Sequence, residues 1–317
     1  MYRDPLKDII DKQGYALLDG GLATELEARG GDLNDRLWSA KMLMDNPELI
    51  RDVHLDYYRS GADIVVSASY QATIEGFMQK GLSREQSKGL LVKSVELVKE
   101  AREIYLNSLS SVTGKLIPLV AASIGPYGAY LADGSEYSGN YGLTLNELMM
   151  FHRPRLEVLW KASPDLVVFE TIPCKLEVQA IVQLLQEYPD IPALVSLSTG
   201  DGINTYDGLS ITDSFTRIET CSNILAAGVN CTSPENISIF LQTIKKTQKP
   251  LSVCPNSGEV WNAAGKCWTG IVTGNKFTDY AREWHHSGAR IIGGCCRTTP
   301  ADIREIKKAL ECKGSNT

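Results

Sequence analysis

Histidine is scarce in this chain, with only four among 317 residues, and long apolar runs are missing. Hydrolytic zinc sites draw mainly on histidine and carboxylate ligands, so this scarcity argues against one. The 32 basic residues face 38 acidic ones and form none of the clusters that a nucleic-acid backbone requires. No apolar run approaches the roughly 20 residues that span a bilayer. The sequence therefore predicts no nucleic-acid partner and no membrane partner.

Several other signals are absent. The chain contains no P-loop, no dinucleotide-binding glycine motif after a strand and no nucleophile elbow. Its start, MYRDPLKDIIDKQG, is polar and charged and does not lead into a signal-peptide core. We therefore expect a cytoplasmic protein. In that compartment the eight cysteines should stay reduced, as buried fillers, metal ligands or reactive thiols and not as a disulfide framework.

Short apolar, often β-branched segments recur along the whole chain. They are residues 16–20, 63–69, 116–123, 165–171, 192–198, 225–231, 250–256 and 290–296. Continuous apolar character is typical of strands covered on both faces in a parallel sheet. Amphipathic segments of helical period, such as 47–61, 84–109 and 176–189, lie between them. Eight such units predict a single domain, a (β/α)8 barrel of TIM type over residues 1–317.

Two connections, residues 125–142 and 256–270, are longer than the others and rich in Gly, Tyr, Asn and Trp. Long loops at the carboxyl ends of barrel strands commonly build active sites, and their aromatic content suits a lid over a small ligand. The alternative is a pair of solvated loops with scattered aromatic residues. Further on, Thr299 and Pro300 are typical of a helix start, with Thr299 as the N-cap.

Three cysteines fall at strand ends: Cys231 closes the sixth predicted strand, and Cys295 and Cys296 follow the eighth. All three should lie on the face where barrel sites form. Three thiolates with one open position are typical of a catalytic zinc site, because structural sites use four protein ligands.

The spacing of these cysteines matches no standard zinc pattern. The glycines at 293 and 294 favour the site because they let the backbone turn closely around an ion. The chain must also bend there, since adjacent cysteines cannot both point inward along a regular strand. The alternative is that each cysteine is a small buried hydrophobe. We expect that role for Cys174, Cys221, Cys254, Cys267 and Cys312.

Two carboxylates also close predicted strands, Asp19 in LLDGG and Glu170 in VVFETIP. Both should face the same pocket. An acid shielded from water needs a partner, and the ammonium group of a substrate would serve. The alternative is that each carboxylate accepts hydrogen bonds from loop amides.

Together the segments LLDGGLATELEARG, NPELIRDVHLDYYRSGAD, ASYQAT, SIGPYGAYLADGSEY, GVNC, PNSGE and GGCCRTTP resemble the homocysteine S-methyltransferase family, nearly end to end. GVNC and GGCC are zinc motifs of that family. The resemblance implies that Cys231, Cys295 and Cys296 bind Zn2+. It also implies that Asp19 and Glu170 lie where the family holds the homocysteine amino group.

The segments ASYQAT and GPYGAYLADGSEY look most like the branch whose methyl donor is S-methylmethionine and sometimes S-adenosylmethionine. The implied reaction moves a methyl group to the zinc-bound thiolate of L-homocysteine and forms methionine. Zinc would supply the thiolate, because a free thiol is mostly protonated at neutral pH.

Aromatic faces attract onium cations by about 0.5 to 2 kcal/mol, which makes several aromatic residues candidates for donor recognition. They are Tyr70, Tyr127, Tyr130, Trp261 and Trp268. Packing explains each of them equally well. Two other classes of protein stay open, a metal-free barrel enzyme with structural cysteines and a zinc-storing or redox-sensing protein.

Overall fold

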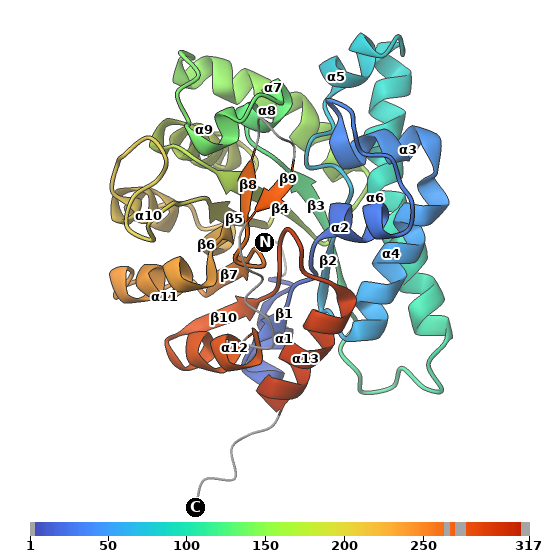
Figure 1. The fold of residues 1–317 in the computed structure, drawn as a ribbon, viewed down its shortest axis with the longest axis vertical. Coiled ribbons are helices and arrows are strands. Elements are labelled where there is room, and N and C mark those ends of the chain that lie inside the picture. Colours follow the sequence, from blue (N-terminus) through green and yellow to red (C-terminus); the bar gives the residue numbers. More distant parts are fainter. Residues whose placement is uncertain (1–3, 263–266, 270–276, 312–317) are drawn as a thin grey trace, which may run out of the picture.

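The computed structural model describes residues 4–262, 267–269 and 277–311, with side chains described in 4–259 and 277–311. Eight parallel strands form a nearly closed barrel surrounded by helices (Figure 1). In order around the barrel the strands are β1 (Ala16–Leu17), β10 (Ala289–Ile292), β7 (Leu251–Pro255), β6 (Ile224–Thr232), β5 (Ala193–Leu197), β4 (Leu166–Ile172), β3 (Leu119–Ile124) and β2 (Ile64–Val66). A parallel bridge between Leu18 and Ile64 brings the first strand back to the second. The predicted (β/α)8 barrel is confirmed.

An outer layer of helices covers the barrel. Its main members are α4 (Pro47–Ser60), α6 (Arg84–Asn107), α8 (Leu145–Lys161), α9 (Lys175–Glu187), α10 (Ile211–Glu219), α11 (Pro234–Thr243), α12 (Phe277–His286) and α13 (Pro300–Glu311). The shorter ones are α1 (Lys7–Gln13), α2 (Leu22–Ala28), η1 (Trp38–Lys41), α3 (Met42–Asp45), α5 (Ile74–Gln79), α7 (Tyr127–Leu131) and η2 (Ser135–Tyr137). The three helices predicted over 47–61, 84–109 and 176–189 correspond to α4, α6 and α9. None of the helices in the described ranges is long and apolar enough to cross a membrane, and the cytoplasmic location stays a prediction.

Two hydrophobic clusters stabilise the barrel. The larger one fills the space between strands and helices, and the smaller one fills the barrel interior. In the smaller cluster Leu6 and Ile9, at α1, pack against inward-facing strand residues such as Leu166 and Leu194. This packing seals the amino-terminal end of the interior. The carboxyl ends of the strands, where barrel enzymes carry their sites, lie at the opposite end of the interior.

The two long connections differ in structure. Residues 125–142 contain α7 and η2, whereas 256–270 contain an antiparallel hairpin of β8 (Val260–Asn262) and β9 (Cys267–Thr269). The long connection over 256–270 therefore contains two short strands that were not predicted from the sequence. The signal was present in the sequence, since β-branched and aromatic residues flank a short stretch that contains glycine.

The last helix begins as predicted. The amide of Thr299 donates to Asp302 Oδ2 at 2.8 Å, and the amide of Asp302 donates to Thr299 Oγ1 at 3.3 Å. This reciprocal pair satisfies two amides that the first turn of a helix leaves unpaired. The capping fixes α13 directly after the turn that carries Cys295 and Cys296.

His54 on α4 is an unusual core residue. It is fully buried, and neither ring nitrogen has a hydrogen-bond partner among the described residues. Burial lowers the pKa of His54 to about 3. The folded protein therefore keeps this ring neutral, whereas the unfolded chain binds the proton near pH 6.5.

Because the folded pKa is the lower one, stability is complete above pH 6.5 and falls as the pH drops toward 3. The loss is about 1.4 kcal/mol per pH unit in that window. We expect His54→Leu to remove this slope and to raise stability at pH 7 by about 1 kcal/mol or more, because two buried unpaired nitrogens disappear. Urea unfolding at pH 7, 6 and 5 measures both effects. Parallel pH profiles for variant and wild type would contradict the expectation.

Candidate metal centre and substrate pocket

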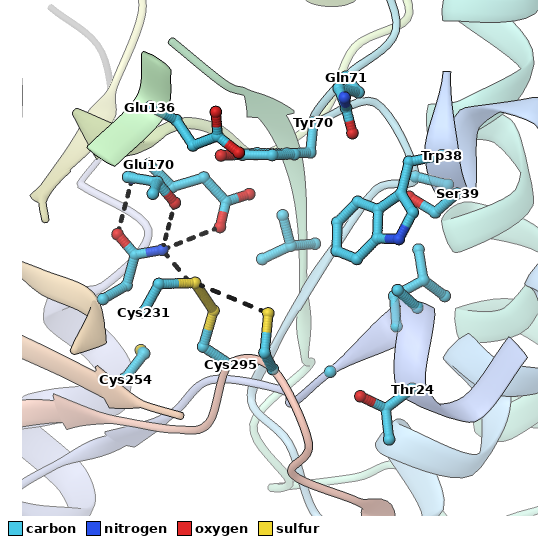
Figure 2. A pocket seen from close by; sticks show the side chains of 18 of the residues that line it. Thr24, Trp38, Ser39, Tyr70, Gln71, Glu136, Glu170, Cys231, Cys254 and Cys295 are labelled. Carbon is cyan, nitrogen blue, oxygen red and sulfur yellow. Dashed lines mark hydrogen bonds between the residues drawn. A yellow bond between two sulfur atoms is a disulfide. The ribbon is translucent and has the colours of Figure 1, made fainter. Parts of the chain in front are cut away.

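A cavity of about 650 Å³ opens at the carboxyl ends of the strands. All five residues predicted for the site line it, namely Asp19, Glu170, Cys231, Cys295 and Cys296. Figure 2 shows Glu170, Cys231 and Cys295 in this cavity. They come from the ends of β1, β4, β6 and β10, which are far apart in sequence. The connection over 125–142 contributes a further wall through Glu136 and Tyr137.

The three predicted ligand cysteines meet in this cavity. Their sulfur atoms all lie within 4.8 Å of one another, and Cys231 Sγ is 3.9 Å from Cys296 Sγ. Tetrahedral ligation with Zn–S bonds of about 2.3 Å places sulfur atoms about 3.8 Å apart. The cluster thus has the size and the donor atoms that suit a thiophilic metal ion.

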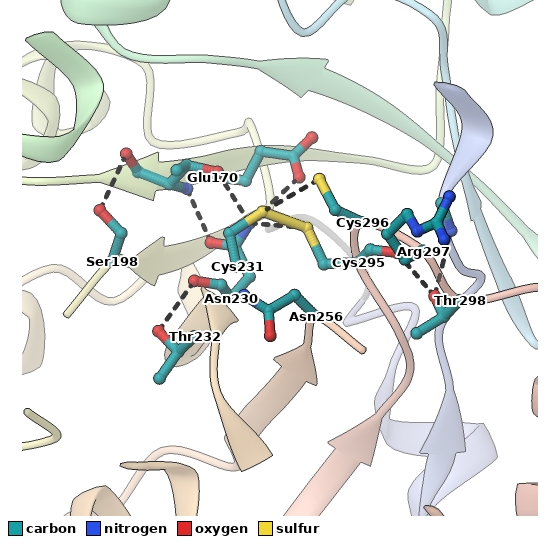
Figure 3. Close-up of a disulfide and its surroundings, with 12 residues drawn as sticks. Glu170, Ser198, Asn230, Cys231, Thr232, Asn256, Cys295, Cys296, Arg297 and Thr298 are labelled. Carbon is teal, nitrogen blue, oxygen red and sulfur yellow. Dashed lines mark hydrogen bonds between the residues drawn. A yellow bond between two sulfur atoms is a disulfide. The ribbon is translucent and has the colours of Figure 1, made fainter. Parts of the chain in front are cut away.

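Cys231 and Cys295 are joined by a disulfide in this structure, with their Cα atoms 5.5 Å apart (Figure 3). The expectation that every cysteine is reduced is wrong for this pair. The physical reason is the convergence itself, because strand ends that bring three thiols together also bring two sulfur atoms within bonding reach. Cys296 remains a thiol.

The cysteines expected to be fillers behave as such where their side chains are described. Cys174, Cys221 and Cys254 are buried free thiols, while Cys312 and the side chain of Cys267 lie outside the described part. Cys254 also lines the cavity from β7 but does not belong to the sulfur cluster.

Electrostatics around Cys296 favour a bound cation. Burial raises the pKa of its thiol to about 12, and the carboxylate of Glu170 adds to the rise. A metal ligand must be the thiolate, which this environment disfavours unless a positive charge accompanies it. The side-chain Nδ2 of Asn230 donates to Cys295 Sγ at 3.9 Å, a contact that would stabilise negative charge on this sulfur when it is a metal ligand.

An irregular backbone aims the side chains at the end of β6. Cys231 has a φ of +49°, in the left-handed region, and the register between β6 and β7 shifts between Asn230 and Thr232. Neighbouring residues on a regular strand point to opposite faces, so this bulge lets both Asn230 and Cys231 line the cavity. Left-handed non-glycine residues are costly and concentrate at functional sites.

The turn after β10 carries the cysteine pair. The strand ends at Ile292, so Cys295 and Cys296 follow a bend, as predicted. A Cβ on Gly293 would lie 2.7 Å from the carbonyl oxygen of Leu18, and one on Gly294 would lie 2.1 Å from Thr298 Oγ1. Packing against Leu18 and Thr298 therefore requires both glycines, and their role beside an ion stays a prediction.

Asp19 is buried and Glu170 is half-buried beside the sulfur cluster. Asp19 Oδ2 accepts the amide of Val66 at 2.8 Å, and Glu170 Oε1 accepts the hydroxyl of Ser123. Burial raises the pKa of Asp19 well above its usual range, with Glu170 adding to the rise. Burial also raises the pKa of Glu170 to about 7. A cationic ligand would stabilise the ionised form of both acids. Asp19 also accepts a backbone amide, which agrees with the alternative that these carboxylates bind amides of the chain.

Asn230 is a site residue that the sequence argument missed. Its Oδ1 accepts the amide of Thr171 at 2.7 Å, and its Nδ2 donates to Thr171 Oγ1 at 2.8 Å and to Glu170 Oε2 at 3.5 Å. It thereby links Glu170 to the neighbouring cysteine. The sequence offers one indication that Asn230 belongs to the site, namely its position directly before Cys231.

The aromatic wall of the cavity differs from the expected one. Tyr70 lines the cavity as proposed, but Tyr127 and Tyr130 do not, and pack on Phe151 at ring distances of 4.9 and 5.6 Å. Trp38 and Tyr137 line it instead. The side chains of the other two candidates, Trp261 and Trp268, lie outside the described part.

Comparison with known proteins gives a consistent result. The family model for homocysteine S-methyltransferase matches residues 16–310. Homocysteine S-methyltransferase 2 from Zea mays is 53% identical over 306 residues, covering 94% of this chain and 90% of that protein. The crystal structure of the homocysteine methyltransferase MmuM from Escherichia coli matches in its metallated form with a TM-score of 0.87 and 47% identity, and in its oxidized form with 0.87 and 46%; each match covers 96% of this chain and 99% of that one. The chain belongs to the homocysteine S-methyltransferase family.

Proposed function

We propose that this protein transfers a methyl group from S-methylmethionine to L-homocysteine and forms methionine, with Zn2+ held by Cys231, Cys295 and Cys296. S-adenosylmethionine is the second candidate donor. The observation that carries the proposal is the convergence of three cysteine sulfur atoms and two carboxyl groups in one cavity. The names of the relatives support the acceptor, and the metallated form of the Escherichia coli protein supports a metal.

Zinc bound by three thiolates would keep the thiol of homocysteine deprotonated at neutral pH. The protein's own groups then fix the acceptor, with Asp19 and Glu170 binding its ammonium group and Asn230 orienting Glu170. The new bond forms between the acceptor sulfur and the methyl carbon. The electron pair of the breaking bond returns to the donor sulfur, which leaves as a neutral thioether, so no general acid is needed.

The direct test combines metal content with product formation. Protein purified under reducing conditions should contain about one zinc per chain and form methionine from homocysteine and S-methylmethionine. Removing the metal with a chelator should abolish turnover, and added zinc should restore it. Full activity without metal would overturn the zinc assignment. Bound zinc without methionine from either donor would overturn the donor assignment and favour a zinc-storing protein.

The two carboxylates give a separate prediction. Asp19→Asn and Glu170→Gln should each raise the KM for homocysteine about 10- to 100-fold, the usual range for a lost hydrogen bond between charged groups. The KM for the donor should change little. Steady-state kinetics with each substrate varied in turn measures this difference. Ser123→Ala is the control, because it removes a hydrogen bond to Glu170 and leaves the charge in place. An unchanged homocysteine KM in both carboxylate variants would contradict the assignment.

A further inference from the structure

Glu136 is a carboxylate of the cavity wall to which neither the sequence nor the comparisons assign a role. It lies in η2, lines the same cavity as the sulfur cluster, and reaches toward the ring of Tyr70 (Figure 2). Its Oε2 atom is buried and has no hydrogen-bond partner among the described residues. A buried carboxylate oxygen without a partner is costly, and at the wall of a binding cavity it points to a ligand.

The backbone holds Glu136 firmly in place. The amide of Tyr137 donates to the carbonyl of Gly134 at 3.0 Å, and the amide of Gly139 donates to the carbonyl of Ser135 at 3.0 Å. At Gly128 in α7 an added Cβ would lie 2.3 Å from the amide nitrogen of Glu136. The short helices α7 and η2 therefore pack backbone to backbone, which presents the carboxylate on a rigid element.

The charges around the cavity favour a cationic ligand. The described lining residues include six carboxylates but one cationic side chain. The carboxylates are Asp19, Glu27, Asp35, Asp133, Glu136 and Glu170, and the cation is Arg36. The guanidinium of Arg36 donates to the carbonyl of Leu131 at 3.2 Å, and Asp35 pairs with Lys80.

The remaining acids also have other tasks. Asp133 caps its own turn by accepting the amide of Ser135 at 3.0 Å, and Glu27 is exposed. Asp19 and Glu170 are taken by the acceptor under the proposed function. Glu136 is thus the carboxylate of this cavity with a buried free oxygen and no assigned ligand.

The methyl donor has chemistry that matches this free oxygen. S-methylmethionine carries a sulfonium, an ammonium and a carboxylate group, so its net charge is +1, whereas homocysteine is neutral overall. Tyr70 and Trp38 line the same cavity with ring centroids 6.3 Å apart, and their faces suit a sulfonium cation. We propose that Glu136 binds the α-ammonium group of the methyl donor and so selects sulfonium donors that carry an amino group. This inference rests on the proposed function.

The test compares two donors that differ only in the amino group, S-methylmethionine and 4-(dimethylsulfonio)butanoate. In the wild type we expect kcat/KM to favour S-methylmethionine by about 10- to 100-fold, the range for a charge-assisted hydrogen bond. In Glu136→Gln this preference should largely disappear, because only the donor with the amino group loses affinity. The KM for homocysteine should stay within about twofold of the wild-type value, since its ammonium group binds elsewhere.

The matched control is Glu27→Gln, which removes one negative charge from an exposed residue of the same cavity. If Glu136→Gln keeps the preference for S-methylmethionine, the inference is overturned. If the preference falls equally in both variants, the inference is also overturned, because the overall negative charge of the cavity and not Glu136 then selects the donor. A rise in homocysteine KM alone would overturn it in favour of an acceptor role. Thermal unfolding and zinc content of each variant show whether the fold and the metal site are intact.

Calorimetric titration with S-methylmethionine separates this inference from the proposed function. If the wild type binds S-methylmethionine and Glu136→Gln binds it at least about tenfold more weakly, the ammonium site stands even if no methionine forms. If both proteins bind S-methylmethionine equally, the inference fails although the proposed function can still hold.

Discussion

Cys295→Ala is expected to lose its bound zinc and nearly all methionine formation. Two thiols are too few to hold the ion, because catalytic zinc sites use three protein ligands. Losing even a hydrogen-bonding partner of a ligand costs about 10- to 100-fold in metal affinity or activity, so losing a ligand should cost more than about 100-fold. Burial raises the pKa of the Cys296 thiol to about 12, which makes this one of the two remaining cysteines a poorer ligand still. Metal analysis and a methionine assay on the same preparations measure both losses.

Cys254→Ala is the matched control for this experiment. Cys254 is a buried free thiol that lines the same cavity from β7, but its sulfur lies outside the three-cysteine cluster. The control should therefore keep its zinc and its turnover. If Cys295→Ala keeps both as well, the three-thiol site is wrong and the cysteines are structural. If both variants lose zinc, zinc binding depends on the packing of the cavity, and the loss in Cys295→Ala does not identify a ligand.

The barrel could be predicted because parallel strands covered on both faces have an unmistakable sequence pattern. Each of the eight apolar segments became a strand, and the carboxyl ends of those strands brought Asp19, Glu170 and the three cysteines together. Strand order along the chain and the polarity of a parallel sheet are enough to place these five residues at one end of the barrel.

Features that depend on local backbone irregularity could not be predicted. The left-handed conformation of Cys231 and the register shift beside it bring Asn230 into the cavity, and regular alternation would have excluded it. Trp38 reaches the cavity from a segment without helical or strand periodicity, and it also has a left-handed backbone, with a φ of +47°. Tyr127 and Tyr130 have the aromatic rings expected for donor recognition. Their role as packing residues is seen only in their contacts with Phe151.

A buried polar network ties the wall that carries Glu136 to the helical layer. Arg155 Nη2 donates to His152 Nδ1 at 3.1 Å, and His152 Nε2 lies 2.8 Å from Glu177 Oε1. Because a guanidinium only donates, the ring of His152 accepts at Nδ1 and donates to Glu177 from Nε2. Burial lowers the pKa of His152 despite the neighbouring Glu177, which agrees with a neutral ring.

Both ends of this network hold the start of the 125–142 connection. Glu177 Oε1 accepts the amide of Tyr127 at 2.8 Å, and Arg155 Nη2 donates to the carbonyl of Gly125 at 2.7 Å. Helices α8 and α9 thus fix the segment that leads to η2. The network involves no residue of the sulfur cluster, so its contribution to stability can be measured without disturbing the metal site.

Glu177→Ala should lower the free energy of unfolding by about 3 to 5 kcal/mol, because Arg155 stays buried with its charge uncompensated. Glu177→Gln should cost less, since its amide oxygen can still accept from Tyr127 and His152. The control on the same helix is Glu187→Ala, which breaks a surface ion pair with Arg153 and should cost about 1 kcal/mol or less. Urea unfolding followed by circular dichroism ranks the three variants. If Glu177→Ala is as stable as Glu187→Ala, the network does not hold the wall. If Glu177→Ala unfolds early and also weakens donor binding while homocysteine KM is kept, the same contacts that stabilise α8 and α9 position the donor side of the cavity.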